Sequence, residues 1–323
     1  MGELLRVEHL RAESGQRTDG YLKVAEMQDG SPARVPVSLI NGAEEGPTIY
    51  LQAISDGDEL NGISVIRQVL KRLDPTVMSG RVIAVLIVNF HAFHAHQAFS
   101  PVDEKKMNRC FPGRKDGTSS ERIAYRLFHN AVLQSDYCID LHQGGRRPMI
   151  DEVRVRVDRR KRIHRVCMEM AQVFGIGYIL DQRGPEGQLA RSAPDEGIPT
   201  IDPELGGCLG WDRESIQKGI TGVENVLKYY GVIPGEPFIP KKQVVVDGFL
   251  TVLANRGGFI EFHAQHYDHL QKGDPVADIT DPFGNVLETL RAPEESIFWS
   301  ENLLPMVSSG EMVATLGKNI RYV

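Results

Sequence analysis

The sequence lacks the features that mark membrane and nucleic-acid-binding proteins. No apolar run among its 323 residues approaches the length of a membrane-spanning helix. Its first residues do not place a basic segment before an apolar core, so we expect no secretory signal. The net charge of −6 gives no general attraction to nucleic acids or to anionic membranes. These absences predict a cytoplasmic protein that binds neither nucleic acid nor membrane.

Cysteine is scarce, and its spacing is uninformative. Cys110, Cys138, Cys167 and Cys208 are widely separated and form no CxxC pair. We therefore expect reduced thiols rather than a disulfide framework or a structural zinc site. Cys110 and Cys208 are expected to be buried small apolar side chains. Glycine-rich phosphate loops and nucleophile-elbow serines are absent too, which argues against nucleotide-driven and serine-hydrolase chemistry.

Strand and helix patterns alternate through the first two thirds of the chain. Their order predicts an α/β fold, in which a mostly parallel or mixed sheet is wrapped by helices. Apolar runs predict strands over residues 48–54, 81–90, 137–141 and 178–180. Helical periodicity is expected over residues 63–73, after the capping-box sequence 118–121, and over residues 163–174 and 216–230.

The pattern changes after a Pro/Gly-rich stretch at residues 231–237. Short strands separated by Gly-containing turns are expected over residues 244–253, 258–262, 275–279, 286–290 and 312–316. We therefore predict two domains. Residues 1–235 form an α/β catalytic domain with an N-terminal β segment, and residues 236–323 form an all-β accessory domain.

Two polar segments follow predicted strands, where sites in such sheets usually lie. The first is Asp56-Gly57-Asp58-Glu59, and the second runs from residue 140 to 145 and contains His142. Two carboxylates and an imidazole make up a three-ligand metal site that leaves one coordination position for water. By composition alone, a carboxylate pair at a helix start is more often an N-cap with a favourable dipole contact.

Four ordered motifs decide between these alternatives. They are residues 56–62, the Asn-Arg-Cys-Phe-Pro-Gly segment 108–113, the Asp-Leu-His-Gln-Gly-Gly segment 140–145, and the Pro-Glu-Leu-Gly-Gly segment 203–207. In order and spacing they resemble the succinylglutamate desuccinylase and aspartoacylase family of the zinc carboxypeptidase superfamily. The resemblance covers nearly the whole chain from about residue 35 and implies a zinc-carboxypeptidase-like mixed sheet. It also implies a lipoyl-like barrel-sandwich C-terminal domain.

The resemblance implies a role for each matching residue. Asp56, Glu59 and His142 would hold Zn²⁺, or a harder ion such as Mn²⁺ because Asp56 adds an oxygen donor. Glu204 would act as general base and acid, for which the alternative is a surface carboxylate at a strand end. Asn108 and Arg109 would grip the substrate carboxylate, since a guanidinium binds a carboxylate through two parallel hydrogen bonds. A structural salt bridge is the alternative for Arg109.

Two positions depart from the family pattern. Asp56 stands where the family has a His, which would change the net charge of ion and ligands from about +1 to about zero. Ala98 stands where the family usually has an Arg that stabilises the oxyanion. Arg146 or Arg147, just beyond His142, could take over that task. A nearby cluster of three histidines (His91, His94 and His96) is expected to be partly exposed or close to the site rather than to bind a metal.

The favoured function is a metal-dependent amidohydrolase that removes an acyl group from an N-acylated amino acid. A metallocarboxypeptidase acting on short peptides is the alternative among enzymes. A degenerate family member that binds a small carboxylate ligand without efficient turnover is the alternative outside enzymes, and Asp56 and Ala98 favour it. The expected partner is a small-molecule carboxylate. The sequence leaves the oligomeric state open, homo-oligomer included.

Overall fold

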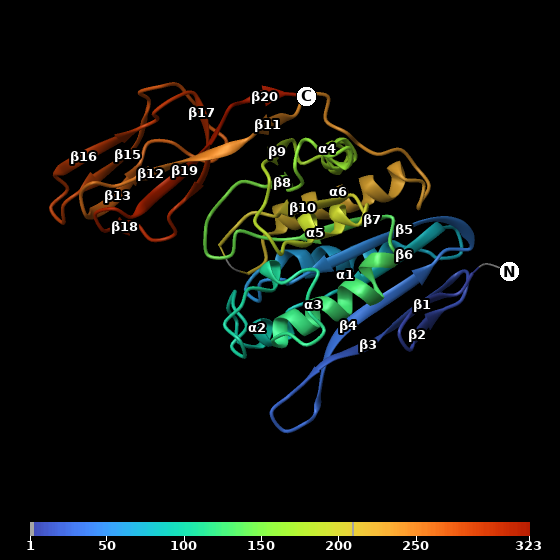
Figure 1. Ribbon diagram of the computed structural model, residues 1–323. Helices are drawn as coiled ribbons and strands as arrows, with labels where there is room; N and C mark the ends of the chain where they lie inside the picture. Colours follow the sequence, from blue (N-terminus) through green and yellow to red (C-terminus); the bar gives the residue numbers. More distant parts are fainter. Residues whose placement is uncertain (1–2, 209) are drawn as a thin grey trace.

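The computed structural model covers the whole chain and describes residues 3–208 and 210–323. Figure 1 shows the arrangement of its elements. The helices are α1 (Asn61–Arg72), α2 (Phe90–His94), α3 (Ser119–Asn130), α4 (Ile163–Phe174), α5 (Leu189–Asp195) and α6 (Arg213–Tyr229), with 3₁₀ turns η1 (Met107–Arg109) and η2 (Val132–Gln134). The strands are β1 (Leu5–Val7), β2 (Leu10–Ala12), β3 (Gln16–Glu26), β4 (Pro32–Asn41), β5 (Glu44–Ala53), β6 (Ser79–Val85), β7 (Tyr137–Leu141), β8 (Glu152–Val155), β9 (Tyr178–Asp181), β10 (Thr200–Glu204), β11 (Val244–Val246), β12 (Gly248–Leu253), β13 (Gly258–Phe262), β14 (His269–Leu270), β15 (Pro275–Thr280), β16 (Val286–Arg291), β17 (Ser296–Glu301), β18 (Met306–Val307), β19 (Met312–Lys318) and β20 (Arg321–Tyr322).

A large mixed sheet forms the centre of the molecule. Its ten strands follow the order β20-β11-β9-β8-β10-β7-β5-β6-β4-β3. The neighbours β10, β7, β5 and β6 run parallel to one another, whereas β8 is antiparallel to β10. Because parallel strands end at the same edge of a sheet, the residues that follow β5, β7 and β10 meet there.

The sheet is covered on both faces, as the apolar strand sequences predict. Alternate residues of β5 point to opposite sides: Ile49 and Leu51 pack with α1, α4 and α6, whereas Tyr50 packs with α3, α5 and the β1–β2 hairpin. The helix ends follow the local sequence. Gly175 ends α4 in the left-handed conformation, with φ of 83°. The Glu121 carboxylate accepts a hydrogen bond from the Thr118 backbone N–H, 2.8 Å away, at the start of α3, where the capping box is predicted.

The C-terminal strands form two further four-stranded sheets, β12-β19-β17-β14 and β16-β15-β13-β18. Figure 1 shows them as a separate lobe in orange and red. Two strands of the same region, β11 and β20, instead join the edge of the large sheet. The division of the chain into two domains near residue 235 stays a prediction.

The structure corrects two expectations from the sequence. The apolar run 81–90 is not one strand, because β6 ends at Val85 and Phe90 already begins α2. The Asn89 side chain accepts a hydrogen bond from Ala92 N and caps that helix. Cys208, expected to be buried, is exposed, whereas the other three cysteines are buried. All four are free thiols.

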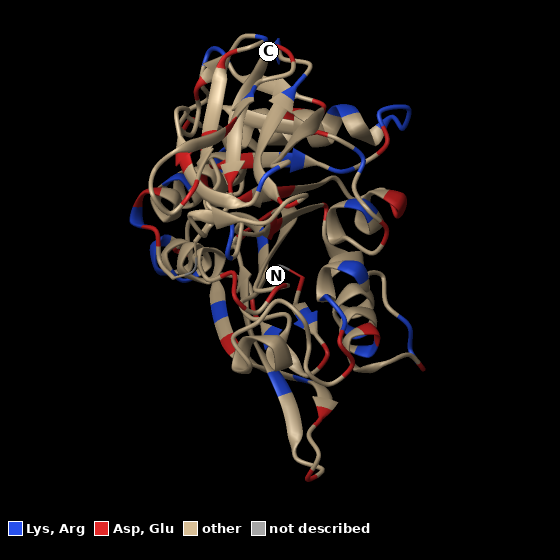
Figure 2. Cartoon of the chain, turned by 90° about the vertical axis from the view of Figure 1, so that its left-hand side faces the viewer, with Lys and Arg blue, Asp and Glu red and all other residues tan. Residues whose placement is uncertain are grey.

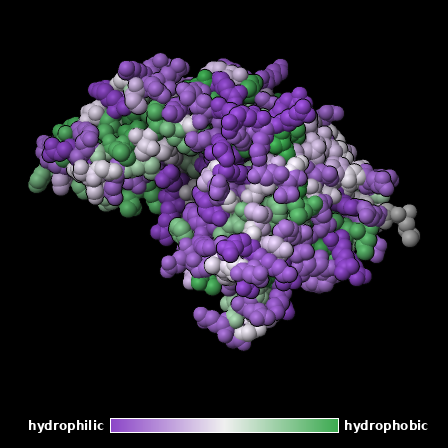
Figure 3. All heavy atoms as spheres, viewed as in Figure 1, coloured by the Kyte–Doolittle hydropathy of each residue, from purple (hydrophilic) through white to green (hydrophobic). Residues whose placement is uncertain are grey.

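The surface bears mixed charge and scattered apolar patches. Figure 2 shows acidic and basic residues interspersed along the chain, without one dominant sign. Figure 3 shows apolar residues on the C-terminal lobe, where Phe283 is 89% exposed. None of the helices in residues 3–208 and 210–323 has both the length and the apolar character that crossing a membrane requires.

Candidate functional site

A cavity of about 740 Å³ lies at the carboxyl ends of the parallel strands. The loop after β5 contributes Asp56 and Glu59, the end of β7 contributes His142, and the end of β10 contributes Glu204. The backbones of His142 and Glu204 form a parallel bridge, which holds these two residues side by side. The structure therefore brings together residues from three of the four sequence motifs at this edge. Asn108 and Arg109, from the fourth motif, line the same cavity.

Glu59 and His142 are in direct contact. His142 Nδ1 lies 2.8 Å from Glu59 Oε2, which also accepts a hydrogen bond from the backbone N–H of Gln143. The other ring nitrogen, Nε2, lies 3.1 Å from Asp140 Oδ2, without the alignment of a hydrogen bond. Burial, and next the Asp56 carboxylate, raise the pKa of Glu59 well above its ordinary value. Burial alone would lower the pKa of His142, but the carboxylates of Asp140, Asp202 and Glu59 together outweigh burial and raise that pKa well above its ordinary value.

The carboxylate pair does not cap α1. The Gln143 side-chain oxygen accepts hydrogen bonds from Leu60 N and Asn61 N, at 2.9 and 3.0 Å, and so satisfies the first amides of the helix. No acidic residue lies in the first turn of α1. The N-cap alternative for Asp56 and Glu59 is therefore wrong.

Asp56 has a cationic partner that the sequence analysis missed. Lys106 Nζ lies 3.0 Å from Asp56 Oδ2, while Asp56 Oδ1 is buried and finds no hydrogen-bond partner in the described part of the chain. Burial by itself would lower the pKa of Lys106, but the attraction of the Asp56 carboxylate raises it above its ordinary value. Lys106 lies fifty residues from Asp56, and no sequence pattern links the two.

The donor set fits a divalent cation in its chemistry. It offers two carboxylates and an imidazole. Within residues 3–208 and 210–323, Asp56 Oδ1 has no hydrogen-bond partner, and the second ring nitrogen of His142 lies 3.1 Å from a carboxylate oxygen of Asp140. Across residues 3–208 and 210–323, no group of three or more His, Cys, Asp or Glu side chains is arranged so that it could hold a metal ion. The three-ligand metal site stays a prediction.

Glu204 is held by a half-buried arginine, Arg154. Arg154 Nη1 lies 2.5 Å from Glu204 Oε1, and Arg154 Nη2 lies 2.7 Å from Glu152 Oε1. Burial raises the pKa of Glu204, and the nearby Arg154 guanidinium offsets part of that rise. Because Glu204 is only 6% exposed and lines the cavity, the surface-carboxylate alternative is wrong.

Sequence reasoning missed Arg154, although a signal was present. In residues 152–157, charged side chains alternate with valines, so Glu152 and Arg154 share one face of β8, and Arg156 continues the alternation just after the strand ends. That face is covered, because Glu152 is fully buried and Arg156 is only 7% exposed. Buried charges at alternate positions of a strand indicate a charge network inside the protein.

The substrate-gripping pair lies on the 3₁₀ turn η1. Asn108 is buried, and its side-chain oxygen has no hydrogen-bond partner. The Arg109 guanidinium donates a hydrogen bond to the Asn108 backbone oxygen. None of the ion pairs found among the described residues involves Arg109, Arg146 or Arg147, although all three line the cavity. The salt-bridge alternative for Arg109 thus finds no partner in residues 3–208 and 210–323. Ala98 is not part of the lining.

The C-terminal lobe closes one side of the cavity. Its contribution comes from the segment after β17 and from the start of β19: Glu301, Asn302, Leu303, Leu304 and Met312. Leu303 and Leu304 are 44% and 57% exposed. Apolar side chains of the C-terminal lobe therefore form part of the cavity lining.

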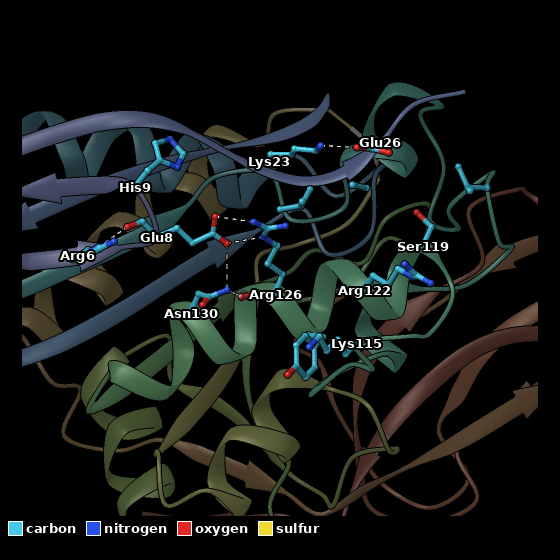
Figure 4. Close-up of a pocket in the computed structure, with 14 residues that line it drawn as sticks. Arg6, Glu8, His9, Lys23, Glu26, Lys115, Ser119, Arg122, Arg126 and Asn130 are labelled. Atoms are coloured by element: carbon cyan, nitrogen blue, oxygen red, sulfur yellow. Dashed lines mark hydrogen bonds and ion pairs between the residues drawn. The ribbon is translucent and has the colours of Figure 1, made fainter. Parts of the chain in front are cut away.

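Other hollows lie elsewhere. Figure 4 shows a larger one, about 1030 Å³, between α3 and strands of the N-terminal region. Two of its cations are paired, Arg126 with Glu8 and Lys23 with Glu26. The three histidines also lie apart from the site: His91 is buried and lines a different cavity, and His94 and His96 are exposed.

Comparisons with known proteins identify the family. Residues 45–230 match the succinylglutamate desuccinylase/aspartoacylase catalytic domain. The N-alpha-acetyl-L-2,4-diaminobutyric acid deacetylase of Halomonas elongata is 28% identical over 311 residues, which cover 93% of this chain and 91% of that protein.

Two solved structures have a similar fold. A succinylglutamate desuccinylase/aspartoacylase from Rhodobacter sphaeroides is 26% identical, with a TM-score of 0.83 over 94% of this chain and 95% of its own. The product-bound ectoine utilization protein EutE (DoeB) from Ruegeria pomeroyi is 24% identical, with a TM-score of 0.85 over 96% and 97% of the two chains. The domain match spans more than half of the 323 residues. This chain therefore belongs to the succinylglutamate desuccinylase/aspartoacylase family.

Proposed function

We propose that the protein is a metal-dependent deacylase that hydrolyses the amide bond of an N-acylated amino acid. One observation carries the proposal. One cavity is lined by Glu204, the Glu59–His142 pair and Arg109, which come from separate strands and turns. Arg109 forms no ion pair among the described residues, so its guanidinium is available to a substrate carboxylate. The name of the Halomonas relative, a deacetylase of an N-acetylated amino acid, supports the same reaction class.

Each side chain has a defined task in this proposal. Arg109 binds the substrate carboxylate through its planar guanidinium, and Asn108 donates a hydrogen bond to the same carboxylate from its side-chain NH2 group. Glu204 accepts a proton from the attacking water and passes it to the nitrogen of the leaving amine. Its raised pKa suits this exchange, because a base works best when its pKa lies close to the working pH. Arg146 or Arg147 stabilises the oxyanion in place of the family Arg at Ala98.

The metal part of the proposal involves Asp56, Glu59 and His142. Zn²⁺ is the expected ion, with Mn²⁺ as the alternative that the oxygen-rich set favours. When bound, such an ion polarises the scissile carbonyl and lowers the pKa of water. The buried, unpartnered Asp56 Oδ1 and the Glu59–His142 contact support these residues as its ligands. The relation to zinc carboxypeptidases and the lipoyl-like character of the C-terminal sheets are also proposals.

A hydrolysis panel with a metal assay on the same samples tests the function. The panel contains N-acetyl, N-succinyl and N-formyl derivatives of acidic, basic and neutral amino acids, together with short peptides. We expect hydrolysis of at least one N-acyl amino acid and a loss of activity on chelation that added Zn²⁺ or Mn²⁺ reverses. Cleavage of peptides alone would favour the carboxypeptidase. Tight binding without hydrolysis would favour the degenerate binder, which the Asp56–Lys106 contact supports.

Replacing Arg109 tests the substrate carboxylate. Arg109→Lys keeps the charge but loses the two parallel donors, so we expect KM to rise about ten-fold or more for carboxylate-bearing substrates. The corresponding amides should be much less affected. Arg114→Lys, in an exposed position of the same segment, serves as control. A fall in thermal stability without any change in KM would show that Arg109 is structural.

A further inference from the structure

The replacement of an imidazole by Asp56 adds a negative charge to the predicted ligand set. A neutral imidazole, Glu59 and His142 carry a charge of about −1 together, whereas Asp56, Glu59 and neutral His142 carry about −2. The Lys106 ammonium lies 3.0 Å from Asp56 Oδ2. With Lys106 included, the total returns to about −1. The ion pair of Asp56 and Lys106 thus has the net charge of the imidazole that it replaces.

The two side-chain oxygens of Asp56 have different surroundings. Lys106 binds Oδ2, whereas Oδ1 is buried and has no hydrogen-bond partner among the described residues. The Asp56 side chain is 5% exposed and that of Lys106 is 32% exposed, so water screens this pair less than it screens a pair on the surface. An unpaired oxygen in such a place is costly unless something binds it. The arrangement leaves Oδ1 available to a cation, while Lys106 fixes the opposite oxygen.

Lys106 is held where it can keep this contact. Its backbone oxygen accepts hydrogen bonds from Arg109 N at 3.0 Å and from Cys110 Sγ at 3.2 Å. Its Nζ also lies 5.4 Å from the centre of the Phe99 ring, in a cation–π arrangement. The neighbouring Lys105 has a different partner, Glu121, 2.9 Å from its Nζ, and does not line the cavity.

We propose that Lys106 is a positioning residue for the cation site: it supplies the positive charge that compensates Asp56 and thereby lowers the affinity of the site for divalent cations. This inference rests on the metal dependence proposed above. Lys106 acts through Asp56, since its ammonium binds Oδ2 and leaves Oδ1 to the ion. Because like charges repel strongly in a poorly solvated site, removing the ammonium must favour a cation at Asp56.

Metal titration of four variants tests this role. Apparent dissociation constants for Zn²⁺ and Mn²⁺ are measured by competition with a chromophoric chelator on chelator-stripped protein. We expect Lys106→Met and Lys106→Gln to bind both ions at least about ten-fold more tightly than the parent, because a nearby positive charge is gone. Lys106→Arg keeps the charge and should bind as the parent does. Lys105→Met, which removes a charge outside the cavity, should do the same.

A second readout guards against a folding defect. Lys106→Met leaves the buried Asp56 carboxylate without its partner, so the stripped variant should melt below the parent, and saturating Zn²⁺ should raise its Tm more than it raises the parent's. Unchanged or weaker metal binding by the two neutral variants would overturn the role of Lys106 while leaving the proposed function intact. If no protein, parent included, binds either ion, both the metal dependence and this inference fail.

Discussion

Glu204→Gln is expected to lower the rate of hydrolysis by at least about two orders of magnitude while substrate binding and metal content stay normal. Glutamine has the shape of glutamate. Its side-chain oxygen can still accept a hydrogen bond from Arg154 Nη1, which lies 2.5 Å from Glu204 Oε1. It cannot take a proton from the attacking water. Single-turnover hydrolysis of the best substrate of the panel measures the loss, and the metal is assayed on the same samples.

The pH dependence provides the internal control for this experiment. Burial raises the pKa of Glu204, so the parent's rate should rise with pH at a value above that of an ordinary carboxylic acid. The residual rate of Glu204→Gln should lack this step. Glu186→Gln, an exposed carboxylate with 90% of its side chain accessible, should behave as the parent. Turnover of Glu204→Gln at the parental rate would remove the general-base role.

Much of the site could be predicted from the sequence because motif order reflects strand order. Asp56, His142 and Glu204 each follow or end an apolar run, and parallel pairing of β5, β7 and β10 brings those ends together. The helix α3 was predictable because its capping sequence is local, with Glu121 three residues after Thr118. A capping sequence, and residues that follow parallel strands to the same sheet edge, can both be recognised from the sequence alone.

The missed residues depend on contacts that are distant in the sequence. Lys106 pairs with Asp56 across fifty residues, and nothing near either residue indicates the other. The long β3–β4 hairpin lies at the sheet edge, and its strand β3 is largely exposed, so its apolar pattern is weak. The end of β6 was misplaced because residues 86–88 stay apolar after the strand has ended. These side chains still pack against the core, although the strand pairing of β6 with β4 and β5 ends at Val85.

Arg154 was missed for a different reason, and its replacement is expected to have the largest effect on stability. The side chain is 18% exposed and lies between Glu152 and Glu204, whose carboxylates are both buried. Arg154→Met keeps most of the apolar stem but leaves two buried carboxylates without their cation. Removing one partner of a buried ion pair costs about 3–5 kcal/mol. Urea denaturation should reveal a loss of that size at neutral pH.

The loss of stability in Arg154→Met should be larger at high pH than at low pH. Without Arg154, the already raised pKa of Glu204 rises further, so the folded protein holds a proton that the unfolded chain releases near the ordinary value of 4.5. When the folded state binds more protons than the unfolded state, stability falls as pH rises above that value. The variant should therefore be closer to the parent at pH 5 than at pH 8.

A surface arginine provides the matched control. Arg160 pairs with Asp158 at 2.7 Å, but 86% of its side chain is exposed, so water already screens its charge. Arg160→Met should leave the denaturation midpoint and its pH dependence unchanged. If Arg154→Met behaves like this control, the carboxylates of β8 and β10 do not depend on the guanidinium. If instead Arg154→Met loses much stability, and more at pH 8 than at pH 5, Arg154 is the cation that keeps Glu204 charged inside the cavity. A general base must be charged in this way to accept a proton.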